Sequence, residues 1–267
     1  MKKILFQFFT IIILFFSTWF VLNQVNWVSV LKIKQHTKRT EEKLGDMVWD
    51  MIKNSETENT SSVAKSAVNR LKNRICEFNH IDSNRIKIHI LDKDEVNAFA
   101  LPNNHLVIYS GLIEACETEA ELNGIISHEI AHMEKNHLMR KLINEVGLTT
   151  LVTLTSGNGG AALLKEIIKK LSSTAYNRKL ETEADETAVE YMINAKIDPE
   201  PLAVFLFRLS KPENNIPREL YWISTHPDSE DRAKHIVEII KDREITNEPV
   251  LTTEDWGLLK SKMKERT

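Results

Sequence analysis

The chain has 267 residues, of which 42% are hydrophobic and 27% are charged, and its formal net charge is −3. This composition can fill the core of one or two domains, and it excludes a disordered chain and a basic nucleic-acid-binding protein. The two cysteines, Cys76 and Cys116, exclude a disulfide scaffold and a four-cysteine zinc module, and two separate core residues are favoured over a single bridge. Any bound metal must therefore rely on histidines and carboxylates.

An apolar run from Ile4 to Leu22 follows two lysines at the amino terminus. As a helix, this run extends about 28 Å, which matches the hydrocarbon core of a bilayer. It ends in a polar stretch without the small-residue exit of a signal peptide, so we expect an uncleaved single-pass anchor within residues 1–30. More basic residues follow the run than precede it, so the positive-inside rule slightly favours a cytoplasmic location for the rest of the chain. The side of the membrane is left undetermined.

The next part of the chain predicts helices followed by a small sheet. Apolar residues at helical spacing indicate a membrane-proximal helical arm over residues 31–76. Arg85–Leu91 alternates polar and apolar residues, and Leu106–Tyr109 is a short apolar run, so each predicts a strand. Asn97–Leu101 predicts an edge strand that ends in a turn, because Pro102 cannot lie in a central strand.

The remainder of the chain is expected to be helical. Thr118-Glu119-Ala120-Glu121 is typical of a capping box, which predicts a helix from Thr118 to about Gly147. Residues 147–164 are apolar but rich in glycine and threonine, which indicates a lid or hinge and not a second membrane crossing. Further helices are predicted over Ala161–Ser173, Arg178–Asn194, Pro199–Leu209, Glu230–Arg243 and Thr253–Lys264.

The predicted fold class is α+β, a mainly helical body with a small sheet that is preceded by one N-terminal transmembrane helix. The predicted parts are an anchor (1–30), a membrane-proximal arm (31–76), a metal-binding domain (77–245) and an amphipathic C-terminal tail (246–267).

The strongest chemical signal is His128-Glu129-Ile130-Ala131-His132, inside the predicted capped helix. Positions i and i+4 share a helix face, so His128 and His132 can bind one Zn²⁺ at about 2.0–2.1 Å, with Glu129 beside the water that the metal activates. The alternative is two histidines on a solvated face. The apolar residues around the motif argue against it, because they anchor this helix in a core. The pattern therefore predicts the metal site of a zinc hydrolase.

A catalytic zinc needs a third protein ligand, and His137 is too close to His132 for the third histidine of a metzincin. The acidic helix further along the chain offers carboxylates instead. Glu181 and Asp185 are four residues apart and share a face, whereas Glu183 points elsewhere. We expect Glu181 to bind zinc and Asp185 to accept the other ring N–H of a ligand histidine. A solvated acidic face is the alternative for this helix.

Five segments together resemble the membrane-linked zinc metallopeptidases similar to HtpX and BepA, a group that includes the CAAX prenyl endopeptidase. They cover roughly residues 85–240 and are Asn97-Ala-Phe-Ala-Leu-Pro, Ser110-Gly-Leu-Ile, His128-Glu-Ile-Ala-His132, Arg178-x-x-Glu181-x-Glu-Ala-Asp185, and Thr225-His226-Pro227 with Arg232. Asn103-Asn104 replaces two glycines of the family, and Asn177 replaces a serine, but asparagine suits a turn. Because it lacks the extra spans of the integral-membrane members, the chain looks closer to the BepA-like members.

The resemblance implies a zincin-like domain of the gluzincin type that holds one Zn²⁺ per chain. By resemblance, His128, His132 and Glu181 are the metal ligands and Glu129 is the general base. Asp185 would not bind the metal itself but would accept a hydrogen bond from one of the histidines that do.

The resemblance also implies a place for the substrate. It brings His226 close to the metal, where this residue would stabilise the oxyanion or occupy the open coordination site as a latch. We expect a substrate strand to add by main-chain hydrogen bonds to the edge strand at Asn97, Ala98 and Phe99.

The implied function is that of a membrane-anchored zinc endopeptidase that cleaves misfolded or envelope proteins in quality control. Its partners would be protein or peptide substrates and the membrane, with no nucleic acid. The BepA-like relatives work outside the cytoplasm, so the resemblance favours an extracytoplasmic (periplasmic) catalytic domain. An alternative is a non-catalytic chaperone or assembly factor that uses the same groove, although the intact His, Glu, His and Glu set argues against it. The natural substrate, the cleavage preference and the oligomeric state stay undetermined.

Overall fold

The computed structural model divides into two compact units, Met1–Thr40 and Glu41–Thr267. Most of the predicted anchor lies outside the residues that it describes. Residues 10–17 of the first unit are helical and expose apolar side chains such as Ile13 and Phe15. Among the described residues, no helix combines the length and the apolar character that a bilayer crossing requires. The structure describes residues 3, 7, 10–17, 33–158, 160–173, 175–211 and 221–265.

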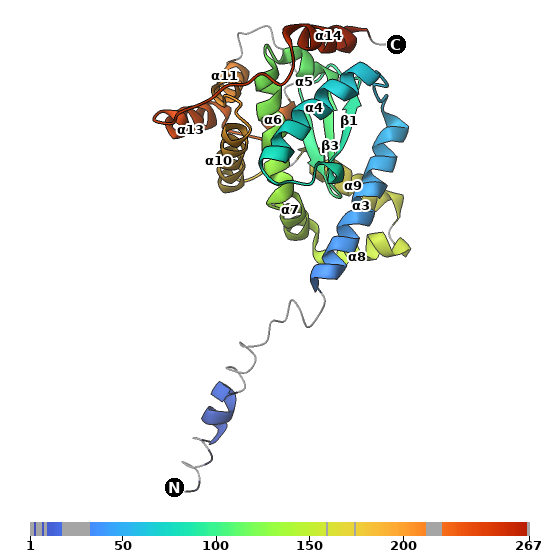
Figure 1. Cartoon of the computed structure of the whole chain (residues 1–267). Helices are drawn as coiled ribbons and strands as arrows, with labels where there is room; N and C mark the ends of the chain where they lie inside the picture. Colours follow the sequence, from blue (N-terminus) through green and yellow to red (C-terminus); the bar gives the residue numbers. More distant parts are fainter. Residues whose placement is uncertain are drawn as a thin grey trace. The chain divides into compact units, whose positions relative to one another are not determined.

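The second unit is mainly helical and contains one three-stranded sheet, which confirms the α+β body (Figure 1). The strands are β1 (Lys87–Leu91), β2 (Ala98–Leu101) and β3 (His105–Tyr109). The helices are α3 (Ile33–Ser55), α4 (Ser62–Phe78), η1 (Ser83–Arg85), α5 (Ser110–Ala115), α6 (Glu119–Glu134), α7 (His137–Val146), α8 (Leu148–Thr153), η2 (Leu154–Asn158), α9 (Ala161–Ser173), α10 (Arg178–Asn194), α11 (Glu200–Leu209), α12 (Tyr221–Thr225), α13 (Ser229–Ile240) and α14 (Thr253–Lys264).

The strand order is β1-β3-β2, with β1 parallel and β2 antiparallel to β3, so β2 lies at an edge as predicted. The central strand β3 is buried along its whole length. Asn103 and Asn104 connect β2 to β3 with φ angles of 62° and 56°, a left-handed conformation that asparagine tolerates better than most residues. The predicted edge strand and its turn are therefore confirmed.

The register of β2 against β3 determines which main-chain groups of β2 are available to pair with a further strand at the open edge of the sheet. The N–H of Tyr109 donates to the carbonyl of Asn97 at 3.0 Å, so these two residues form a hydrogen-bonded pair. Because such pairs alternate along an antiparallel ladder, the main chain of Phe99 also faces β3. The main-chain groups of Ala98 and Ala100 consequently face the open edge of the sheet.

Two hydrophobic cores cover the two faces of the sheet. Along β3, Leu106 and Ile108 belong to the first core, which contains buried residues of α4, α6, α10, α11 and α13. Val107 and Tyr109 alternate with them and belong to the second core, which contains buried residues of α3, α7 and α9. This alternation follows from the period of two in a strand. The sheet is thus a thin layer between two sets of helices.

Both cysteines are core residues. Cys76 on α4 and Cys116 after α5 are free and buried. Burial raises the pKa of the Cys76 thiol to about 11 and raises that of Cys116 as well, so both thiols stay protonated at neutral pH. The interpretation as two separate core residues is confirmed.

The predicted helix from Thr118 to about Gly147 is wrong in one respect, because the structure has two helices there. Thr118 caps α6 as expected, since its side chain accepts a hydrogen bond from the N–H of Glu121. The helix ends before Asn136, which has a left-handed φ of 55°, and α7 begins at His137. A left-handed residue terminates an α-helix and redirects the chain.

Two further segments contribute to the cores. The predicted membrane-proximal arm (31–76) includes most of α4, whose Leu71 is buried in the first core. The predicted lid or hinge (147–164) forms α8 and η2 and begins α9, and its Leu151 is buried in the second core. The buried residues of both segments therefore belong to the cores of the second unit.

Candidate metal centre

Four buried side chains converge between α6, α10 and α13. His128 and His132 come from α6, Glu181 from the first turn of α10, and His226 from the connection between α12 and α13. One ligand atom of each residue lies within 4.8 Å of those of the other three. The structure therefore brings together the three predicted ligands and the histidine that was expected near the metal.

The spacing of these atoms fits a tetrahedral zinc ion. The Nε2 atoms of His128 and His132 are 3.0 Å apart, and they lie 3.6 and 3.5 Å from the carboxylate oxygens of Glu181. The Nδ1 atom of His226 lies 3.0 Å from Glu181 and 3.2 Å from His128 Nε2. Zn–N distances of about 2.0–2.1 Å in a tetrahedron separate neighbouring ligand atoms by about 3.3–3.4 Å. The observed separations bracket that value.

The hydrogen bond of His128 orients its lone pair towards the cluster. Its Nδ1 donates to the carboxylate of Asp185 at 2.9 Å, and an ionised carboxylate can only accept. In the neutral ring, the Nε2 lone pair then points at the other ligand atoms. Asp185 thus lies where an outer carboxylate would hold a ligand histidine in the tautomer that binds zinc.

The protonation states also suit a metal. Burial lowers the pKa of His132 well below its ordinary value, which keeps this imidazole neutral. Burial by itself would raise the pKa of Glu181, but His226 and Arg232 outweigh it and hold that pKa well below its ordinary value. A neutral imidazole at His132 and an ionised carboxylate at Glu181 are donors in the protonation states that Zn²⁺ requires.

Arg232 on α13 joins the two carboxylates. Its guanidinium donates two hydrogen bonds of 2.7 Å to Asp185 and lies 2.8 Å from Glu181. Burial by itself would raise the pKa of Asp185, but the charge and the hydrogen bonds of Arg232 outweigh burial and lower that pKa to about 2. Apart from its place in the matching segments, the sequence assigned no role to Arg232.

Glu129 lies between the cluster and the open edge of β2. One carboxylate oxygen accepts a hydrogen bond of 3.0 Å from the N–H of Ala100. The other lies 3.4 Å from the indole N–H of Trp222 and 3.4 Å from Nε2 of His226. The predicted general base therefore contacts both the metal cluster and the strand that was expected to receive the substrate.

The predicted substrate residues divide into two groups. The main chain of Ala98 faces the open edge, as does that of Ala100, which the prediction did not include. The main chains of Asn97 and Phe99 face β3, so only their side chains are available to a ligand. Asn97 is buried, and its side-chain oxygen has no hydrogen-bond partner among the described residues.

Two aromatic rings enclose the cluster. Tyr176 stacks on His132 with ring centroids 4.1 Å apart, and Trp222 stacks on His226 at 4.7 Å. No periodicity or spacing in the sequence identifies either ring. Tyr176 lies just before α10 and Trp222 lies in the short helix α12, and only the tertiary fold brings them to α6.

His137 contacts a ligand histidine. It is fully buried, with its Nδ1 3.0 Å from Nδ1 of His132 and its Nε2 3.3 Å from the carboxylate of Glu183. Glu183 is partly exposed and lies outside the cluster, yet it reaches His132 through His137. The sequence excluded His137 as the third histidine of a metzincin and gave it no other role, so this chain of three side chains is a finding of the structure.

We expect His137→Leu to lower the affinity for Zn²⁺ by about 10–100-fold, because His132 loses the partner that orients its ring. Competition with a chromophoric chelator measures this affinity. His137→Gln should retain part of it, because the amide oxygen can accept the same hydrogen bond. The control is His235→Leu, which removes a similar His–Glu pair, 3.1 Å from Glu186 on the surface of α10. Equal affinities in the His137 and His235 variants would contradict a positioning role.

Comparison with known proteins gives consistent matches. A family model described as peptidase family M48 matches residues 63–240. The mitochondrial metalloendopeptidase OMA1 of Bos taurus is 32% identical over 190 residues, which cover 64% of this chain and 36% of the relative. The metalloprotease LoiP of Escherichia coli (strain K12) is 27% identical over 164 residues, 59% of this chain and 64% of the relative.

A third relative is the beta-barrel assembly-enhancing protease of Escherichia coli (strain K12), 24% identical over 206 residues, which cover 72% of this chain and 42% of the relative. The matched segment spans only part of the length of each of these relatives. The matches confirm the resemblance that the five sequence segments indicated.

Proposed function

The chain belongs to peptidase family M48, whose members are zinc-dependent metallopeptidases, and we propose that it is an endopeptidase that hydrolyses peptide bonds in protein or peptide substrates. The observation that carries this proposal is the position of Glu129, whose carboxylate contacts both the His and Glu cluster and the free edge of β2. An acid–base group, a metal site and a strand-binding edge thus meet at one place.

In the proposed mechanism, His128, His132 and Glu181 hold Zn²⁺. When bound there, the zinc ion would supply Lewis-acid chemistry, which polarises a substrate carbonyl and lowers the pKa of water towards about 7. Asp185 holds the imidazole of His128 in the required tautomer. The charge and the hydrogen bonds of Arg232 keep Asp185 ionised, and the charges of His226 and Arg232 keep Glu181 ionised, so Asp185 can accept the hydrogen bond of His128 and Glu181 can serve as a carboxylate ligand.

Glu129 is the proposed general base. Its carboxylate would take the proton of the attacking water and pass it to the leaving amine. The hydrogen bond from the N–H of Ala100 holds the carboxylate at the strand edge, where the substrate's main chain would lie. The substrate would pair with the main-chain groups of Ala98 and the carbonyl of Ala100.

His226 is the proposed fourth group at the metal. Its Nδ1 lies where a fourth ligand would lie, and its Nε2 is 3.4 Å from Glu129. This position supports a latch that occupies the open coordination site in the free protein. The same side chain would donate a hydrogen bond to the oxyanion once the substrate displaces it.

The cellular setting is also a proposal. The apolar run at Ile4–Leu22 and the exposed apolar side chains of residues 10–17 support a single-pass anchor within residues 1–30. By analogy with the relatives, the body would lie outside the cytoplasm and cleave misfolded or envelope proteins. We retain residues 31–76 as the membrane-proximal arm, 77–245 as the peptidase domain and 246–267 as the C-terminal tail.

The test uses the full chain in detergent with a reduced and alkylated, unfolded protein as substrate. We expect one zinc per chain by metal analysis, cleavage that stops with a chelator, and recovery when Zn²⁺ is restored. Bound zinc without any cleavage would favour a non-catalytic chaperone or assembly factor with the same groove. A protein that binds no zinc would contradict the central proposal.

A further inference from the structure

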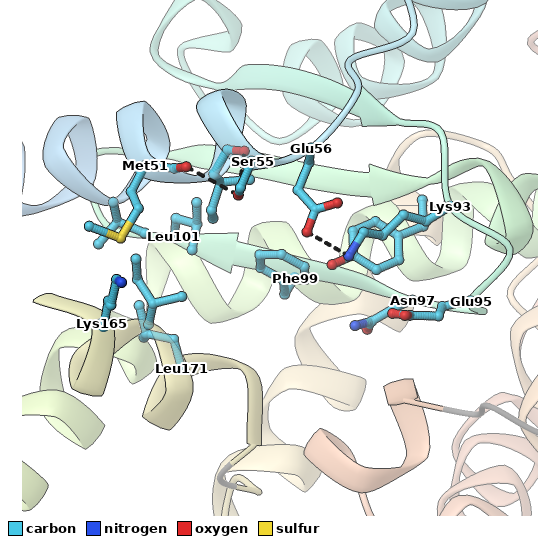
Figure 2. Close-up of a pocket in the computed structure, with 14 residues that line it drawn as sticks. Met51, Ser55, Glu56, Lys93, Glu95, Asn97, Phe99, Leu101, Lys165 and Leu171 are labelled. Atoms are coloured by element: carbon cyan, nitrogen blue, oxygen red, sulfur yellow. Dashed lines mark hydrogen bonds and ion pairs between the residues drawn. The ribbon is translucent and has the colours of Figure 1, made fainter. Parts of the chain in front are cut away.

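A cavity of about 490 Å³ lies between helix α3, helix α9 and the face of the sheet that carries Phe99 and Leu101 (Figure 2). This volume falls within the range of about 300–1,000 Å³ that is typical of ligand pockets, and it exceeds the volume of one bulky side chain. The apolar part of its wall is formed mainly by Val48, Met51, Phe99, Leu101, Ile168 and Leu171.

The cavity adjoins the strand that we propose receives the substrate. The side chains of Phe99 and Leu101 line the cavity, whereas Ala98 and Ala100 alternate with them and point into the opposite face. The main-chain groups of the two alanines face the open edge. A peptide strand that pairs with this edge must therefore project every second side chain to the cavity's side of the sheet.

The polar groups of the cavity also fit a peptide. Asn97 lines the wall, is buried, and has a side-chain oxygen without a hydrogen-bond partner among the described residues. A buried acceptor of this kind carries an energetic cost that a donor from a ligand would relieve, and a peptide supplies N–H donors. The charged residues of the lining are the ion pair between Lys93 and Glu56, at 2.8 Å, together with Glu95 and Lys165. Figure 2 shows Lys165 on the opposite side of the cavity from Lys93 and Glu56, with Phe99, Leu101 and Leu171 between them.

We propose that this cavity is a subsite for a large apolar side chain, such as Leu, Met or Phe, of an extended substrate that pairs with β2. This inference rests on the proposed peptidase function and adds a substrate class to it. A charged side chain would lose its hydration against the apolar part of the wall formed by Phe99, Leu101 and Leu171, and is disfavoured there. The preference for bulky apolar residues has a period of two along the substrate, because only alternate side chains reach the cavity.

The test uses the zinc-loaded full chain and quenched fluorescent peptides that differ at one position at a time over three residues on each side of the cleaved bond. We expect kcat/KM to be at least about tenfold higher with Leu than with Ala or Asp at a position that faces the cavity. At the neighbouring positions, the same exchange should change kcat/KM by less than about threefold.

A pocket-filling variant gives a second readout. Met51→Trp on α3 should abolish the advantage of Leu over Ala, measured as the ratio of kcat/KM for the two peptides. The matched control is Lys53→Trp on the same helix, since Lys53 pairs with Asp50 on the surface and does not line the cavity. Met51→Trp with an unchanged Leu preference would overturn the subsite.

The outcomes separate this inference from the proposed function. Cleavage of all peptides without an alternating preference would overturn the subsite and leave the peptidase function in place. If the zinc-loaded chain cleaved no peptide, the proposed function would fail, and fluorescence anisotropy with the same labelled peptides would decide the subsite. The subsite would be supported if Leu peptides bound more tightly than Asp peptides and if Met51→Trp abolished this difference. Equal binding of Leu and Asp peptides would overturn the subsite.

Discussion

The substitution Glu129→Gln is expected to lower the rate of peptide cleavage by about 10²–10⁴-fold while the protein keeps its zinc. Glutamine has nearly the same shape as glutamate. Its single amide oxygen can accept the 3.0 Å hydrogen bond from Ala100, whereas its NH2 group cannot accept the 3.4 Å one from Trp222, so glutamine keeps the shorter of the two contacts. It cannot take a proton from water. Because Glu129 is not one of the four clustered ligand residues, the metal site itself is unchanged.

The measurement is kcat on a quenched peptide, together with the zinc content of the purified variant. The matched control is Glu134→Gln at the end of the same helix, where the carboxylate pairs with Arg85 at 2.5 Å on the surface. This control should cleave at the normal rate. A Glu129→Gln protein that retains both zinc and full activity would place the general base elsewhere.

The second large effect is expected for Glu181→Gln, which should lower the affinity for Zn²⁺ by more than about 100-fold. Substitution of a residue that only hydrogen-bonds to a metal ligand typically lowers the affinity by about 10–100-fold. The carboxylate of Glu181 lies 3.6 and 3.5 Å from the ligand nitrogens of His128 and His132. A neutral amide of the same shape removes a charged ligand without leaving a cavity. Chelator competition and activity measured against added Zn²⁺ check this expectation.

Glu183→Gln is the matched comparison, because this residue lies two positions along the same helix. It contacts the metal ligands only through His137, at 3.3 Å, so we expect a loss of zinc affinity of about tenfold or less. Circular dichroism would show that both variants are folded. A larger loss in Glu183→Gln than in Glu181→Gln would reject the choice of ligand.

Local sequence patterns predicted the residues whose relative positions a single helix determines. His128 and His132 share a face because an α-helix turns about 100° per residue, and the same geometry relates Glu181 to Asp185. The edge strand was also predictable, because Pro102 excludes a central position. The structure brings the two helix pairs together, with Asp185 at 2.9 Å from His128.

His137 shows where such patterns fail. On a continuous helix, five residues would turn His137 about 140° away from His132, on a different face. The left-handed Asn136 ends α6, and His137 instead lies 3.0 Å from His132. No sequence rule identifies in advance which asparagine adopts this conformation, because asparagine tolerates it without requiring it.

The main-chain register of β2 could not be predicted from the sequence either. A shift of one residue exchanges the main-chain groups that face β3 with those that face the open edge. Arg232 and Trp222 reach the site through contacts of long sequence separation, which depend on how α12 and α13 pack on α6 and α10. The cavity beside Phe99 likewise exists only where α3 and α9 pack over the sheet.

The sequence alone determined the donor atoms and their spacing within each helix, because covalent geometry and the helical repeat set those distances. The tertiary structure alone decided which histidine Asp185 contacts, the contacts of His137 and Arg232, the strand register and the cavity, because these arise from the packing of the whole chain.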